Sequence, residues 1–205
     1  MALSMLVALT TCPSLLATQE AVRQGQQKDR REAHRARRCN LIATCVKRTG
    51  WATTLNQRPI VLRDSKLVID TATSEDEEDP KHLCTGYFLP YPDSNYEGHV
   101  TSISDDPPVM NWIYVDKHTY EVKYGVRVNA QPHITGPFDC TRQDRRMTLE
   151  GWEGFVAVRQ DDSTWSLYFD RDDNGLKDKV PKGTRVLEVE LWRVEKRRKR
   201  GEAPS

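Results

Sequence analysis

From residue 40 onward, hydrophobic and polar residues alternate along the chain in short runs that are separated by turn-forming residues. The clearest run is 119–127, where Tyr120, Val122, Tyr124 and Val126 alternate with polar or small residues. A period of two is typical of an antiparallel strand with one buried face. Only two residues separate this run from another such run at 109–116, so the pair predicts a β-hairpin.

Other runs enriched in β-branched and aromatic residues predict further strands. They are 41–47, 59–70, 152–159, 164–170 and 184–193, with 59–70 interpreted as one or two strands around Asp64 and Ser65. Residues 160–163 have the composition of a hairpin turn. The chain therefore predicts a mainly β fold, which is an antiparallel barrel or sandwich of about seven or more strands.

A different pattern precedes the strands. Residues 14–38 are rich in strong helix formers, and six Lys and Arg residues lie between 28 and 38. We therefore expect one N-terminal helix with an exposed basic second half. Residues 1–17 are apolar, but no Lys or Arg precedes their apolar run and Pro13 interrupts it, so we expect a lead-in to the helix rather than a secretory signal. No run reaches the roughly 18 apolar residues of a membrane span.

Charge is distributed unevenly although it nearly cancels overall. Lys and Arg total 31 against 30 Asp and Glu, so the net charge favours no polyanionic partner. Residues 74–79 nevertheless hold five acidic residues in six, and 196–200 are all basic. We predict three parts: an apolar segment and basic helix at 1–38, a single β-rich domain at 39–194 with an acidic loop, and a flexible basic tail at 195–205.

Seven sequence runs are distinctive in combination. They are RRCNLIATC (37–45), LRDSKLVI (62–69), NWIYVDKHTYEVKYGVR (111–127), ITGPFDCTRQDRR (134–146), GWEGFVAV (151–158), YFDRDDNGL (168–176) and TRVLEVEL (184–191). In these runs, the chain resembles a family of small fungal proteins of unknown function. The resemblance implies a fungal origin and an accessory role, for instance beside a secondary-metabolite pathway. It implies no particular activity.

The spacing of the cysteines argues against a disulfide framework or a structural zinc site. The chain has five dispersed cysteines and no CxxC pair. Cys39 and Cys45 would lie about 20 Å apart along one strand, which is beyond disulfide reach. Dispersed thiols fit a reducing compartment, so we expect an intracellular protein, cytoplasmic or nuclear, and no cofactor.

Asp170, Asp172 and Asn174, followed by glycine, resemble the start of a calcium loop, because oxygen donors at alternate positions converge on a hard cation. The twelfth position of such a loop should be a bidentate Glu, and here it is Pro181. A turn between two strands is therefore the favoured interpretation, and a calcium site is the weaker alternative.

Candidate catalytic residues gather in the segment 133–146. His133, Asp139, Asp144 and Arg145 supply an imidazole, two carboxylates and a guanidinium group, which can perform acid–base chemistry or hold an anion. Their spacing matches no known triad. An ordered loop whose Asp and Arg residues pair with each other is the favoured interpretation.

Aromatic residues in the predicted strands offer a second kind of site. Trp112, Tyr114, Tyr124, Trp152 and Trp165 could line a cavity for a flat apolar ligand. The same residues could instead fill the core. Strand register decides between the two, and the sequence does not fix register.

Three functions remain open. The leading hypothesis is a non-enzymatic accessory or small-ligand-binding protein, with a small apolar molecule or a protein as partner and no membrane association. One alternative is a cofactor-free isomerase, cyclase or hydrolase that uses the 133–146 segment. A further alternative is a nuclear interaction protein that depends on 196–200, where the absence of interleaved aromatics argues against specific nucleic-acid binding.

Overall fold

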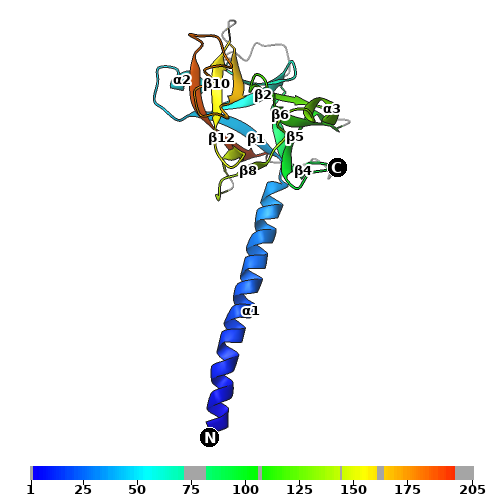
Figure 1. Cartoon of the computed structure of the whole chain (residues 1–205), viewed down its shortest axis with the longest axis vertical. Coiled ribbons are helices and arrows are strands. Elements are labelled where there is room, and N and C mark those ends of the chain that lie inside the picture. Colours follow the sequence, from blue (N-terminus) through cyan, green and yellow to red (C-terminus); the bar gives the residue numbers. More distant parts are fainter. Residues whose placement is uncertain (1, 72–81, 106–107, 144, 161–163, 197–205) are drawn as a thin grey trace. The chain divides into compact units, whose positions relative to one another are not determined.

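The computed structural model describes residues 2–71, 82–105, 108–143, 145–160 and 164–196, and it divides the chain into two units, 1–36 and 37–205. The acidic segment 74–79, the turn residues 161–163 and the tail beyond residue 196 lie outside the described residues. The first unit contains one helix, α1 (Ala2–Arg35), drawn in blue in Figure 1. No helix among the described residues is long and apolar enough to cross a membrane.

Helix α1 begins at Ala2, well before the predicted start at residue 14, and it continues through Pro13. The prediction of a separate lead-in segment at 1–17 is therefore wrong. Ala, Leu and Met have high helix propensity, which favours helix on both sides of Pro13. The side chains of residues 19–33 are all exposed, and they include much of the basic half at 28–38 for which exposure was predicted.

The second unit contains twelve strands and two short helices among its described residues (Figure 1). They are β1 (Cys39–Cys45), α2 (Ala52–Leu55), β2 (Arg58–Arg63), β3 (Lys66–Ile69), β4 (Thr85–Pro90), β5 (Glu97–Asp105), β6 (Pro108–Val115), β7 (Val122–Gly125), α3 (Arg127–Ala130), β8 (Phe138–Cys140), β9 (Met147–Leu149), β10 (Phe155–Arg159), β11 (Trp165–Phe169) and β12 (Val186–Glu195). Adjacent strands pair antiparallel, for example β1 with β12 and β4 with β5. The predicted mainly β, antiparallel class is confirmed.

Six strands close into a ring. β1 pairs with β12 along its whole length and with β4 through Cys39 and Gly86. β4 pairs with β5, and β8 pairs with β9. Contacts of β5 with β8 and of β9 with β12 complete the ring. The closed ring makes this part of the fold a barrel rather than a sandwich.

The other six strands form three hairpins: β2–β3, β6–β7 and β10–β11. The hairpins meet one another, because β3 pairs with both β7 and β11, and β7 contacts β11. The chain therefore repeats one order three times, in which a ring strand is followed by a hairpin and then by a second ring strand. The three repeats are β1–β4, β5–β8 and β9–β12.

One hydrophobic cluster runs through the ring and the hairpins. Leu41 of β1, Leu191 of β12, Ile69 of β3 and Leu167 of β11 belong to it and are at most 1% exposed. Side chains along each strand point alternately inward and outward, and those that point inward pack in this cluster. The shared core is what fixes the positions of the loops and strand ends that form the site described below.

The sequence pattern located some strands better than others. The turn at Asp64 and Ser65 has φ of 48° and 63°, as a type I′ hairpin requires, and separates β2 from β3. The predicted strand 119–127 is shorter in the structure, because β7 ends at Gly125 and an exposed Val126 precedes α3. The predicted strand from residue 152 begins only at Phe155.

Strands β4 and β5 follow no hydrophobic alternation, and the sequence did not predict them. Polar residues of β5 are buried, among them His99 and Thr101, so inward-facing positions do not stand out as apolar. In β4, Gly86 lies opposite Thr101, and a Cβ at Gly86 would be 2.2 Å from the carbonyl oxygen of Val100. Close packing at this point requires glycine, which is a weak strand signal in a sequence.

Candidate functional site

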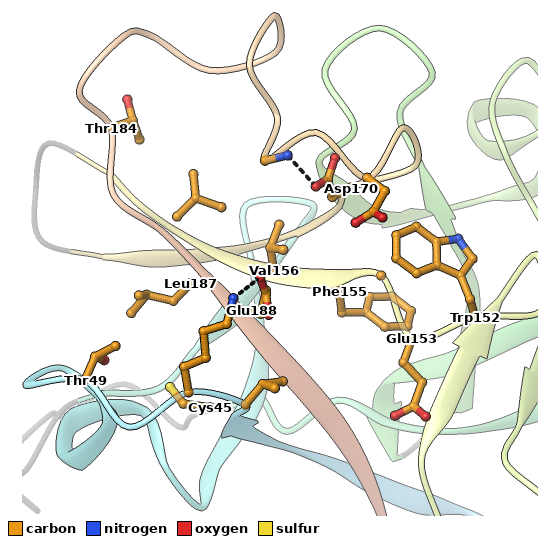
Figure 2. Close-up of a pocket in the computed structure, with 16 residues that line it drawn as sticks. Cys45, Thr49, Trp152, Glu153, Phe155, Val156, Asp170, Thr184, Leu187 and Glu188 are labelled. Atoms are coloured by element: carbon orange, nitrogen blue, oxygen red, sulfur yellow. Dashed lines mark hydrogen bonds and ion pairs between the residues drawn. The ribbon is translucent and has the colours of Figure 1, made fainter.

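A pocket of about 720 Å³ lies in the second unit, where four chain segments meet (Figure 2). Its lining residues come from the end of β1 and the following loop, from 152–156, from the loop after β11, and from 184–188 at the start of β12. This volume falls within the range of about 300–1,000 Å³ that is typical of small-molecule sites. Strand pairing holds the walls together, since Val156 of β10 lies opposite Glu188 of β12.

Part of the lining is apolar. Val186 and Leu187 are half-buried, and Val46 is 54% exposed. Figure 2 shows Leu187 and Val156 between the two threonines at one side, Thr49 and Thr184, and the indole of Trp152 at the other. An apolar ligand body would therefore be able to displace water from this surface.

Trp152 forms one end of the pocket. Its indole packs against Phe169 of β11, with ring centroids 5.4 Å apart. The ring also lies directly over Gly154, where a Cβ would be 2.4 Å from the indole. Only a glycine at this position leaves room for the indole, which is half-buried and faces the pocket.

Asp170 positions the loop that closes the same end. Its backbone N–H donates to the carbonyl oxygen of Gly154 at 2.8 Å, which joins the loop to the Trp152 segment. Its carboxylate accepts backbone N–H groups from Asn174, Gly175 and Leu176 at 3.3, 2.7 and 3.4 Å. The side chain therefore organises a turn, in which Asp173, Gly175 and Leu176 have positive φ.

These contacts also show where the calcium candidates lie. Asp170 is used by the turn, and the side-chain oxygen of Asn174 accepts the N–H of Lys177 at 3.2 Å. Asp172 interacts with the hydroxyl of Tyr120, whose pKa is raised first by burial and then by this contact. Within the described ranges, no group of three or more His, Cys, Asp or Glu side chains is arranged to hold a metal ion. The turn interpretation accounts for the geometry of this segment.

The pocket lining carries four carboxylates, from Glu153, Asp170, Asp173 and Glu188, and one ammonium group, from Lys47. Lys47 Nζ lies 2.7 Å from Glu188 Oε1. Arg146 Nε lies 3.1 Å from Glu153 Oε2. Burial raises the pKa of Glu153, and the charge of Arg146 opposes that rise.

Asp173 differs from the other three carboxylates. Among the residues that the structure describes, its side chain makes no hydrogen bond and no ion pair, and it is exposed. Its backbone N–H donates to the carbonyl oxygen of Asp170 at 3.1 Å, so the turn holds it beside the Trp152 end of the pocket. The pocket lining thus includes one carboxylate that is unpaired among the described residues and one indole, on two segments that the backbone hydrogen bond between Asp170 and Gly154 joins.

The aromatic residues predicted to bind a ligand lie in different places. Trp152 lines this pocket. Trp165 is buried and packs against Trp51, with ring centroids 5.9 Å apart. Trp112 packs against Tyr91 at 4.8 Å, Tyr114 stacks on His133 at 5.1 Å, and Tyr124 is half-buried on β7. The structure therefore brings one of the five to the pocket.

Of the predicted catalytic residues, the three that the structure describes, His133, Asp139 and Arg145, are absent from the lining of this pocket. His133 Nδ1 accepts the backbone N–H of Lys117 at 3.3 Å and lies beside the β6–β7 hairpin. The carboxylate of Asp139 accepts the N–H of Cys140 at 2.6 Å on β8. The carbonyl oxygen of Arg145 accepts the N–H of Arg193 on β12, and Asp144 lies outside the described residues. The segment is also not one loop, since it contains β8.

Sequence reasoning missed Lys47, Glu153, Asp173 and Glu188. Each looks like an ordinary exposed charge in its own segment. What brings Lys47 and Glu188 together is the β1–β12 register, in which Cys45 lies opposite Val189. Asn174 and Gly175 predicted a turn in the loop that contains Asp173. They did not predict that this loop lines a pocket.

Comparison with known proteins gives one result. A family model described as a fungal beta-trefoil domain matches residues 17–197. No curated protein and no solved structure shows a significant match to the chain. A trefoil is a three-part arrangement, and the three four-strand repeats of this structure have that form.

Proposed function

The chain belongs to the fungal beta-trefoil domain family, and we propose that it is a small-ligand-binding protein of that family. The family description specifies a fold, and a fold alone does not specify a function. The proposal therefore depends on the pocket between β1, β10 and β12.

The observation that carries the proposal is the pocket's combination of size and lining. It measures about 720 Å³, and it joins apolar side chains to an indole and to charged groups at defined places. Small-molecule sites are usually concave and combine apolar walls with positioned polar groups, and this pocket has both kinds of lining in nearly equal measure. The ligand that fits is a small molecule with an apolar body and a polar group at one end.

For the role in the cell, the proposal keeps the expected accessory function beside a secondary-metabolite pathway. A protein of this kind would bind a pathway metabolite without transforming it. The enzymatic alternative gains no support from the described contacts of His133 and Arg145, which tie these residues to different elements. The nuclear alternative depends on 196–200, most of which lies outside the described residues, and stays a prediction.

A neutral probe tests the proposal without assuming the ligand's charge. We suggest titrating ¹⁵N-labelled protein with 2-phenylethanol and following the backbone amides and the indole N–H of Trp152 by NMR. Saturable shifts confined to the lining segments 45–49, 152–156, 170–175 and 184–188 are expected. Shifts that lie mainly elsewhere on the second unit would contradict the proposal, and so would the absence of saturable shifts both with this probe and with its amine and carboxylate analogues.

A further inference from the structure

We propose that the ligand of this pocket is a protonated organic amine, with its ammonium group between Trp152 and Asp173 and its apolar body along Val186 and Leu187. This inference rests on the proposed function and adds the chemical class of the ligand. It follows from a comparison of the pocket carboxylates that have an ion-pair or hydrogen-bond partner with the carboxylate for which the described part of the chain provides none.

The first step is the charge balance of the lining, where four carboxylates face one ammonium group. Lys47 pairs with Glu188, Arg146 pairs with Glu153, and three backbone N–H groups contact Asp170. Asp173 remains as the carboxylate that accepts no hydrogen bond and joins no ion pair among the described residues. An excess of one charge sign in a concave wall concentrates ligands of the opposite sign and repels those of the same sign. An anionic ligand is therefore disfavoured, and a cationic one is favoured.

The second step is the aromatic ring at the same end. A cation over an indole is attracted to the negative face of the ring, and Trp provides the strongest such attraction among the aromatic side chains. The Trp152 indole is held in place by Phe169 and by the close contact over Gly154. The N–H of Asp170 bonds to Gly154, and the N–H of Asp173 bonds to Asp170, so the carboxylate and the ring belong to one connected end of the pocket.

The third step distinguishes an amine from a metal ion. Divalent metals in proteins take several oxygen, nitrogen or sulfur ligands at once. Asp173 is a single carboxylate without a described partner, and its neighbour Asp170 is used by backbone N–H groups. The apolar surface of Val186 and Leu187 next to this charge suits an organic body rather than a hydrated ion. Figure 2 shows Leu187 on the side of the pocket away from Trp152, where it would face such a body.

Three probes of nearly equal shape test the inference: 2-phenylethylamine, 2-phenylethanol and phenylacetate. They carry a positive charge, no charge and a negative charge at neutral pH. Calorimetric or NMR titration of the full chain should show that the amine binds about tenfold more tightly than the alcohol. Phenylacetate should bind most weakly of the three.

A pair of variants locates the effect. Asp173→Asn should weaken binding of 2-phenylethylamine about three- to tenfold and leave binding of 2-phenylethanol unchanged. Asp178→Asn is the matched control, because Asp178 is exposed in the same loop, is absent from the lining and changes the net charge by the same amount. Equal weakening by both variants would contradict the inference, since a general charge effect would then explain the preference.

The outcomes separate this inference from the proposed function. If the alcohol or phenylacetate binds in the pocket as tightly as the amine, the amine inference is wrong and the ligand-binding function stands. If none of the three probes binds in the pocket, both are wrong. Preference for the amine, lost in Asp173→Asn and kept in Asp178→Asn, supports both.

Discussion

Lys47 Nζ and Glu188 Oε1 lie 2.7 Å apart, and this ion pair joins the chain after β1 to β12 at the pocket wall (Figure 2). Both side chains are more than half exposed, at 71% and 54%. Exposed pairs of this kind contribute little to stability, because water screens them and ordering long side chains costs entropy. The consequence of the pair is electrostatic: it neutralises one of the carboxylates that a cationic ligand would meet.

Lys47→Met should therefore strengthen the binding of 2-phenylethylamine about two- to threefold, because Glu188 then adds to the negative potential of the pocket. The free energy of unfolding should change by less than about 0.5 kcal/mol. Calorimetry measures the first quantity and urea unfolding the second. Lys182→Met is the control, since Lys182 is exposed and is absent from the lining. Unchanged or weaker amine binding in Lys47→Met would count against the proposed charge balance.

Gly154→Ala should displace the Trp152 indole. A Cβ at this position would lie 2.4 Å from the ring, so the side chain must move or the backbone must shift. Overpacking of this kind typically costs about 1–3 kcal/mol. We expect lower stability in urea unfolding and weaker binding of both 2-phenylethylamine and 2-phenylethanol.

Gly50→Ala provides the comparison for this variant, because a Cβ at Gly50 meets nothing within 4 Å. It should leave stability and binding close to those of the unchanged protein. If Gly154→Ala behaves like Gly50→Ala, the indole is not fixed by the contact over Gly154.

Asp170→Ala should unfold more easily, because the N–H groups of Asn174, Gly175 and Leu176 lose their acceptor. Loss of such contacts typically costs about 1–3 kcal/mol. Urea unfolding measures the effect. Excess calcium should leave the Tm of the unchanged protein where it is, since the turn already uses this carboxylate. A rise of Tm with calcium would revive the alternative of a calcium loop.

Asp116 should give a pH-dependent contribution to stability. Burial raises its pKa, but hydrogen bonds from the Lys123 ammonium and from the N–H groups of His118 and Thr119 outweigh that effect and lower the pKa to about 2. Because the folded pKa lies below the unfolded value of about 3.9, the contribution is present above about pH 4 and is lost as the pH falls toward 2.

The variant Asp116→Asn should accordingly be less stable by about 1–2 kcal/mol at pH 7, and the difference should shrink as the pH falls from 4 to 2. Urea unfolding at a series of pH values gives the comparison. A difference that stays constant over this pH range would show that the charge of Asp116 is not its cause.

The parts of the fold that the sequence predicted are those with local signals. The turn at Asp64 and Ser65 needs residues that tolerate positive φ, and both occur between two apolar runs. Strands β4 and β5 lack such a signal because the barrel buries polar groups there. His99 is fully buried, and burial, with the charge of Arg193, lowers its pKa to about 3, so its imidazole occupies the core as a neutral ring.

The candidate site was predicted only in part, for a related reason. Trp152 stood out as an aromatic residue of a predicted strand, and the Asp170 segment stood out as a turn. Their neighbours in the pocket come from the start of β12 and from the end of β1, and the β1 segment lies far earlier in the sequence. Register and ring closure bring them together, and neither leaves a pattern within a single segment.

The most direct test of the account compares the dissociation constant of 2-phenylethylamine in two variants that carry the same substitution. Val46 lines the pocket and Val128 does not, and both are exposed, at 54% and 78%. Val46→Arg adds a guanidinium group to the lining of the pocket that the account assigns to a cationic ligand, so it should weaken binding about tenfold or more, while Val128→Arg should leave binding unchanged. Equal dissociation constants for the two variants would contradict the account.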